Sequence, residues 1–76
     1  LMSYYCNMVF KRVEFSTAIK TKRHELGIGL REAGEQAGIN YATLSRLENE
    51  HMPDLLTYQK VCEWLDTNMH IFFKKN

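Results

Sequence analysis

The chain has 76 residues and a mass of 9.0 kDa, which allows one small domain with a single hydrophobic core. Its 45% hydrophobic and 25% charged residues are typical of a folded globular protein and exclude a disordered or low-complexity chain. No apolar run approaches the roughly 20 residues that cross a bilayer, so we expect a cytoplasmic protein without a membrane partner. The two cysteines, Cys6 and Cys62, form no Cys-x-x-Cys motif, and we expect both to be reduced.

The charges nearly cancel, but they are distributed unevenly along the chain. Ten Lys and Arg residues against nine Asp and Glu residues leave a net charge of +1, so bulk charge does not indicate an anionic partner. Basic side chains gather between residues 11 and 23 and again at 74 and 75, whereas acidic ones dominate residues 48–66. This asymmetry allows one basic face on the folded domain.

The first half of the chain is predicted to hold an arm and two helices. Residues 1–15 are rich in aromatic side chains without a sustained period, and we expect an N-terminal arm that is partly helical or contains one short strand. Ser16 is a suitable N-cap for the first helix, which stops at Gly27. A second short helix is expected over 30–37 and is closed by Gly38 in the left-handed conformation.

The third predicted helix covers residues 41–49. Asn40 is a good N-cap for it, because an Asn side chain accepts a hydrogen bond from a backbone amide of the first turn. Leu44 and Leu47 are three residues apart, so they share one face and are expected to be buried.

The last part of the chain is predicted to form two more helices. Asp54 caps a fourth helix that ends at Leu65, and Asn68 caps a short fifth helix over 69–73. The fourth helix has a wide apolar face, made of Leu55, Tyr58, Val61, Cys62, Trp64 and Leu65. The sequence therefore predicts a compact all-α domain of five helices over residues 16–76, preceded by the arm.

The second and third predicted helices together have the form of a helix-turn-helix. The turn Gly38-Ile39-Asn40 is short, and Gly38 adopts positive φ without a Cβ clash. Gly34 lies where the two helices must approach closely. Inside a helix, glycine is less stabilising than alanine by about 1 kcal/mol, but its missing side chain permits that contact.

Several short motifs resemble the lambda-repressor-like helix-turn-helix family. They are Lys22-Arg23-x-x-Leu26-Gly27-Ile28, Arg31-Glu32-Ala33, Gly38-Ile39-Asn40, Leu44-Ser45-Arg46-Leu47-Glu48-Asn49 and Met52-Pro53. The motif Cys62-x-Trp64-Leu65 is similar to a branch of that family found among prophage and mobile-element regulators. The resemblance covers residues 16–73 and implies a five-helix DNA-binding domain of a bacterial or phage transcriptional regulator.

The chain departs from the family pattern at three positions. Leu30 stands where the family commonly has a polar residue that contacts a phosphate, and Gly29 replaces the usual Ser or Thr before it. Glu50 replaces the family's glycine after the third helix and adds a negative charge near the expected path of the DNA backbone.

The outer stripe of the third helix holds the candidates for reading bases. With Leu44 and Leu47 inward, the 100° rotation per residue turns the opposite side outward, and an α-helix fits the major groove. The resemblance supports Arg46 most strongly, since that residue matches a base-reading position of the family, and Tyr41 has packing over the turn as an alternative. The base-reading candidates are Asn40, Tyr41, Ala42, Ser45 and Arg46.

Two further kinds of residue are expected around this helix. Arg31, Thr43 and Asn49 are placed to contact phosphates on either side of the groove. Glu48 falls beside the inward face, where an isolated carboxylate is costly to bury, and the resemblance implies a structural ion pair with Arg23 of the first helix.

The expected function is sequence-specific binding of a double-stranded DNA operator by a transcriptional regulator, and we expect a repressor. One recognition helix reads only a few base pairs, so we expect a homodimer on an inverted repeat. The apolar side chains near the C-terminus that we expect at the dimer contact are Met69, Phe72 and Phe73, with Phe72 equally suited to the core.

The residues also bear on two other classes of function. An antitoxin or antirepressor that acts mainly through a protein partner fits the near-zero charge, Leu30, Glu50 and the aromatic arm. Catalysis is not expected, nor is a metal or other cofactor, because no residues stand at metal-ligand spacing. The side chains considered were His24, His51, His70, Cys6 and Cys62.

Overall fold

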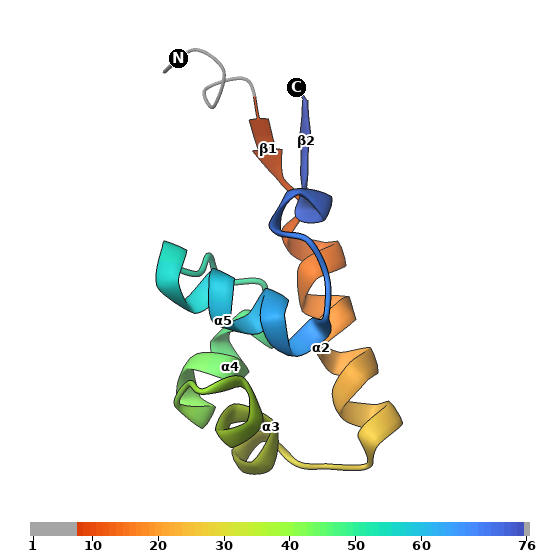
Figure 1. The fold of residues 1–76 in the computed structure, drawn as a ribbon, viewed down its shortest axis with the longest axis vertical. Helices are drawn as coiled ribbons and strands as arrows, with labels where there is room; N and C mark the ends of the chain where they lie inside the picture. Colours follow the sequence, from red (N-terminus) through yellow and green to blue (C-terminus); the bar gives the residue numbers. More distant parts are fainter. Residues whose placement is uncertain (1–7, 76) are drawn as a thin grey trace.

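The computed structural model describes residues 8–75. Within that range the chain is mostly helical, with four α-helices and a small two-stranded sheet (Figure 1). It measures 40 × 21 × 19 Å along its principal axes. The elements in chain order are β1 (Met8–Phe10), α2 (Arg12–Leu26), α3 (Leu30–Ala37), α4 (Tyr41–Glu48), α5 (Leu55–Leu65), the 3₁₀ helix η1 (Met69–Phe72) and β2 (Phe73–Lys75).

Four of the helix ends confirm the capping predictions made from local sequence. Gly27 and Gly38 end α2 and α3 with φ of 67° and 81°, the left-handed region that glycine adopts without strain. Asn40 Oδ1 accepts a hydrogen bond from the Ala42 amide at 2.7 Å at the start of α4. Asp54 Oδ1 accepts one from the Thr57 amide at 2.7 Å at the start of α5, and hydrogen bonding from Thr57 lowers the pKa of that carboxyl.

The first helix begins earlier than predicted, so the predicted N-cap at Ser16 is wrong. Helix α2 starts at Arg12, and Ser16 is buried inside it, where its hydroxyl donates to the Val13 carbonyl at 3.0 Å. Phe15 and Ile19, four residues apart, both face the core, which extends the helix toward the N-terminus. Residues 8–15 of the predicted arm thus belong to the packed unit, and residues 1–7 lie outside the described range.

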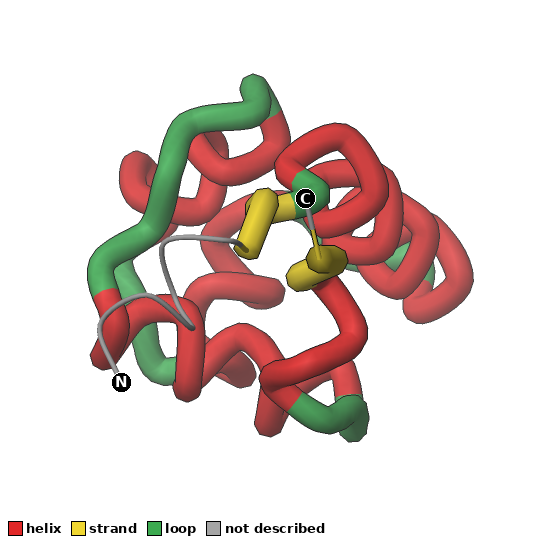
Figure 2. Tube along the Cα trace, turned by 90° about the horizontal axis from the view of Figure 1, so that it is seen from above, coloured by secondary structure: helices red, strands yellow, loops and turns green. Residues whose placement is uncertain are grey.

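The predicted fifth helix is present only as a short 3₁₀ helix, and the domain is mostly helical with a small sheet rather than plainly all-α. Residues 69–72 form the 3₁₀ helix η1, and the chain then runs into β2, which pairs with β1 in antiparallel fashion. The register aligns Met8 with Lys75 and Phe10 with Phe73. The two strands lie next to each other above the helices (Figure 2). Local periodicity could not reveal this sheet, because its two strands come from opposite ends of the chain.

The core lies between the four α-helices and is closed by η1. Its buried apolar side chains include Ile19, Leu44 and Val61, each 0% exposed. The predicted apolar face of the fourth helix is only partly buried, since Leu55 is 75% exposed at the first position of α5. An aromatic cluster joins the sheet to the helices and consists of Phe10, Phe15, Tyr58, Phe72 and Phe73.

Tyr58 holds the chain that leads from α5 to the sheet. Its hydroxyl donates a hydrogen bond to the Met69 carbonyl oxygen in η1. Burial raises the pKa of the Tyr58 phenol, so the group remains a neutral donor. This bond and the aromatic contacts fix η1 against α5. Helices α3 and α4 lie toward the end of the molecule opposite the sheet (Figure 1).

Candidate nucleic-acid interface

A close backbone contact fixes the angle between α3 and α4. A Cβ atom at Gly34 would lie 2.8 Å from the Ile39 carbonyl oxygen and 3.3 Å from the Tyr41 Cα. The amides of Gly38 and Ile39 both donate to the Gly34 carbonyl, at 2.8 and 2.9 Å, and these bonds close the turn. The close approach predicted at Gly34 is confirmed, and α3 and α4 therefore form one rigid helix-turn-helix unit.

The inner side of α4 is anchored by two leucines and an ion pair. Leu44 and Leu47 are 0% and 2% exposed, as predicted. Glu48 accepts two hydrogen bonds from Arg23 of α2, from Nε to Oε2 at 2.7 Å and from Nη2 to Oε1 at 3.0 Å. This bidentate bond raises the pKa of the Arg23 guanidinium. The expected ion pair is present, and it ties α4 to the longest helix.

The outer side of α4 carries the remaining candidate residues. Ala42 and Arg46 are exposed, and Ser45 between them is half-buried. Within residues 8–75 the Arg46 guanidinium makes no hydrogen bond or ion pair, so its donors are available to a ligand. The side chain of Asn40 is exposed, but its Oδ1 is engaged in the cap of α4. The stripe is thus a row of small side chains beside one free arginine.

The three residues expected to contact phosphates are placed differently from one another. Thr43 is half-buried on α4, and Arg31 is exposed on α3. Asn49 is the C-cap of α4 rather than its last helical residue, and its Nδ2 donates to the Ser45 carbonyl at 3.0 Å. One of its two amide hydrogens is therefore used, and the second hydrogen and the carbonyl oxygen remain available.

Arg31 and Tyr41 form a contact that periodicity did not reveal. The Arg31 guanidinium carbon lies 4.3 Å from the centroid of the Tyr41 ring, and Tyr41 itself is 43% exposed. One signal in the sequence pointed to it. Arg31 and Gly34 are three residues apart on the same face of α3, so a side chain packed on Gly34 also reaches Arg31.

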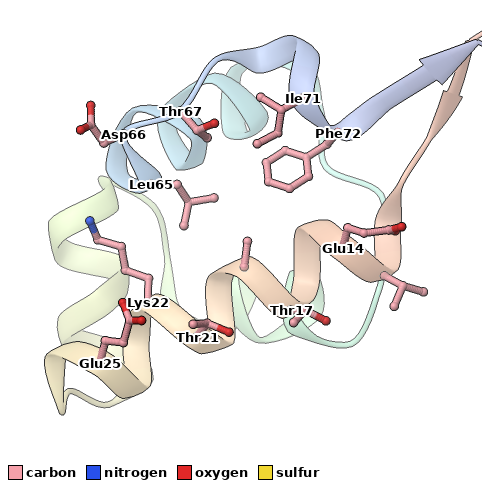
Figure 3. A pocket seen from close by; sticks show the side chains of 12 residues that line it. Glu14, Thr17, Thr21, Lys22, Glu25, Leu65, Asp66, Thr67, Ile71 and Phe72 are labelled. Atoms are coloured by element: carbon pink, nitrogen blue, oxygen red, sulfur yellow. The ribbon is translucent and has the colours of Figure 1, made fainter.

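A shallow groove on another side of the molecule is acidic. It runs between α2 and the connection from α5 to η1 and has a volume of about 830 Å³ (Figure 3). Glu14, Glu25 and Asp66 line it together with one basic side chain, Lys22, whose ammonium lies 5.6 Å from the Trp64 ring. The excess of carboxylates repels phosphates, so this side is not suited to nucleic acid.

Residues 8–75 contain no group of three or more His, Cys, Asp or Glu side chains that is placed to hold a metal ion. Cys62 is a free thiol on the inner side of α5, and burial raises its pKa, which makes it a poor nucleophile. No helix in this part of the chain has the length and apolar character needed to cross a membrane.

Comparison of the chain with protein-family models, with curated proteins and with solved structures found no match. Its function must therefore be inferred from its own residues. Among the described residues, the α3–α4 unit combines a rigid backbone with an exposed helix face. That combination is what recognition of another macromolecule requires.

Proposed function

We propose that the chain is a cytoplasmic transcriptional regulator, most simply a repressor, that binds double-stranded DNA in a sequence-specific manner. The proposed domain is of the lambda-repressor-like helix-turn-helix class, with η1 in the place of the fifth helix. One observation carries the proposal. The exposed face of α4 presents the unengaged Arg46 beside Ala42, while the opposite face is locked by Leu44, Leu47 and the Arg23–Glu48 pair.

The dimensions and chemistry of α4 fit the major groove. An α-helix enters that groove with its side chains against the base edges, and small residues such as Ala42 let the backbone approach. An arginine bonds guanine O6 and N7 in bidentate fashion, which is the commonest specific contact. Rigid attachment of α4 matters as well, because a reading side chain must be held within about 0.5 Å of its productive position.

The test begins with selection of duplexes by the purified chain from a random DNA pool, followed by competition binding. We expect Arg46→Ala to weaken binding by about 1 to 3 kcal/mol and to relax the preference at one base pair only. Lys74→Ala is the matched control, since it removes one exposed positive charge from β2. An equal loss for Arg46→Ala on every duplex would reduce Arg46 to a phosphate contact, and a pool that never enriches would refute the proposal.

We also propose that two copies bind one inverted repeat, because a single α4 contacts only a few base pairs. The half-sites are expected about 10 to 10.5 base pairs apart, which is one turn of DNA.

The expected contact surface between the two copies needs correction, since Phe72 is only 4% exposed and belongs to the core. Met69 and Phe73 are half-buried and remain available in part. Mass measurement of the complex tests the stoichiometry, and one chain per duplex at saturation contradicts it.

A protein partner is the second candidate function, and one observation favours it. Met52, in the connection before α5, is 58% exposed, and Leu55 and Leu56, the first two residues of α5, are 75% and 61% exposed, so this short segment presents an apolar patch. An antitoxin or antirepressor would use such a patch. The two functions are separated by the selection experiment, because a protein that acts only through a partner enriches no DNA sequence.

A further inference from the structure

Arg31 and Tyr41 are brought together by the backbone contact at Gly34. Arg31 is the second residue of α3, and Gly34 follows three residues later on the same face. The missing side chain of Gly34 lets the Tyr41 backbone rest on α3, with Tyr41 Cα 3.3 Å from the position of a glycine Cβ. From there the Tyr41 ring extends over the preceding turn of α3, and its centroid lies 4.3 Å from the Arg31 guanidinium carbon.

The backbone on both sides of this contact is fixed. Asn40 caps α4 through the Ala42 amide at 2.7 Å, and the Ile39 amide is bonded to the Gly34 carbonyl at 2.9 Å. Tyr41 lies between these two anchors. The backbone that carries its ring is therefore fixed, and an arginine stacked on that ring has fewer side-chain conformations than one in solvent.

In the part of the chain that the structure describes, Arg31 has no hydrogen-bond or ion-pair partner, although the residue is exposed. It also lies in the first turn of α3, where the helix dipole disfavours a cation. The position is thus unfavourable for the helix, whereas a guanidinium with free planar donors is well suited to bind an oxyanion in bidentate fashion.

We propose that Tyr41 is a positioning residue that holds Arg31 ready for a DNA phosphate, and that Tyr41 does not itself read a base. The inference deepens the proposed function and rests on it. It also accounts for Leu30, the apolar first residue of α3, whose side chain cannot bond a phosphate. Arg31, one residue further on, supplies the contact, and the Tyr41 ring limits the side-chain freedom that binding would otherwise remove.

The two residues can be separated by conservative variants. Tyr41→Phe keeps the ring and the stack, whereas Tyr41→Leu removes the aromatic face and keeps apolar bulk. Arg31→Lys keeps the charge and loses the planar fork. Arg46→Ala serves as the comparison for a base contact. Because Tyr41 is 43% exposed, these variants are expected to fold, and thermal unfolding of each variant checks that they do.

The experiment measures affinity for the best duplex from the random pool and for a scrambled duplex, at several salt concentrations between about 50 and 200 mM. We expect Arg31→Ala to weaken binding to both duplexes by the same factor and to lower the slope of log K against log salt by about 1. Tyr41→Leu is expected to weaken both equally as well, and Tyr41→Phe to match the wild type. In the Arg31→Ala background, Tyr41→Leu is expected to have no further effect.

Several outcomes overturn the inference while leaving the proposed function intact. A change in base preference with Tyr41→Leu would make Tyr41 a base reader. Fully additive losses for the two substitutions would show that Tyr41 does not act through Arg31, and an unchanged salt slope for Arg31→Ala would show that no phosphate is bound there. Failure of the wild-type chain to enrich any duplex is a different result, since it removes the proposed function and this inference together.

Discussion

Glu50 adopts a backbone conformation that suits glycine. Its φ is 68°, just after the end of α4, and a side chain with a Cβ is strained in that region. Asp66 has a similar φ of 57° at the end of α5, but Asp tolerates the left-handed region better than Glu does. Glu50 therefore stores strain beside the proposed DNA-binding helix and also places a carboxylate there.

We expect Glu50→Gly to raise the free energy of unfolding by about 1 kcal/mol, because the left-handed conformation then carries no Cβ clash. DNA affinity is expected to rise too, since a negative charge near the backbone is removed. Glu50→Gln separates the two effects, because it removes the charge and keeps the strain. Denaturant unfolding and duplex binding are the measurements, and equal stabilisation by both variants would show that charge rather than strain is responsible.

The ion pair between Arg23 and Glu48 acts at the level of whole helices. It joins the C-terminal half of α2 to the last turn of α4, and its two side chains are 18% and 10% exposed. Arg23 Nη1 also donates to the Ile28 carbonyl at 3.4 Å, so the same side chain contacts the connection between α2 and α3. The orientation of the proposed recognition helix thus depends on a residue of another helix.

Removal of either partner leaves the other charge largely buried and unpaired. We expect Arg23→Met or Glu48→Met alone to lower the free energy of unfolding by about 3 kcal/mol, and the double substitution to restore much of that loss. A double-mutant cycle by chemical denaturation measures the coupling. Additive effects with a sum below about 1 kcal/mol would mean that the pair contributes nothing to stability.

Local signals in the sequence were sufficient for most helix ends. Asn40 and Asp54 cap the helices that they were expected to cap, and Gly27 and Gly38 adopt the expected left-handed conformation. These features depend on residues within one helical turn, which is the range that a motif describes. The start of α2 was missed because Ser16 is equally good as a cap and as a buried helical residue bonded to the preceding turn.

Features that depend on distant residues were not predictable in the same way. Phe73 joins a strand because Phe10 lies opposite it, and no local pattern carries that information. At the candidate interface, the buried and exposed sides of α4 followed from periodicity. The stack of Arg31 on Tyr41 did not, because it depends on how closely α3 and α4 approach at Gly34.

The whole molecule is closed by contacts between its two ends. The strands β1 and β2 come before and after all four α-helices in the sequence, so their pairing joins distant residues. The contacts inside the α3–α4 unit, in contrast, join residues that are close in sequence. Bringing distant segments together has a larger entropic cost than closing a short loop. The sheet and its aromatic cluster are therefore expected to form late in folding, after the helices have packed.

We expect Phe10→Ala to act mainly on unfolding. Phe10 is half-buried and packs against the rings of Phe15, Tyr58 and Phe73 in tilted and edge-to-face contacts, so its removal should lower the free energy of unfolding by about 2 kcal/mol. If the contacts of Phe10 form late, unfolding accelerates by about thirtyfold and the folding rate hardly changes. Stopped-flow kinetics across a denaturant series give both rates, and slowed folding instead would place the sheet in the folding nucleus.

The pairing of Met8 with Lys75 also places the two ends of the described chain side by side, at the end of the molecule away from α3 (Figure 1). If these two ends were joined, the chain could be opened at another loop, and the order of the helices along the polypeptide would change without changing the fold. A short linker across the strands and a new opening between Gly27 and Gly29 would give a circular permutant with the same neighbours in space. For the same reason, a label attached to either strand would lie far from the candidate interface (Figure 1).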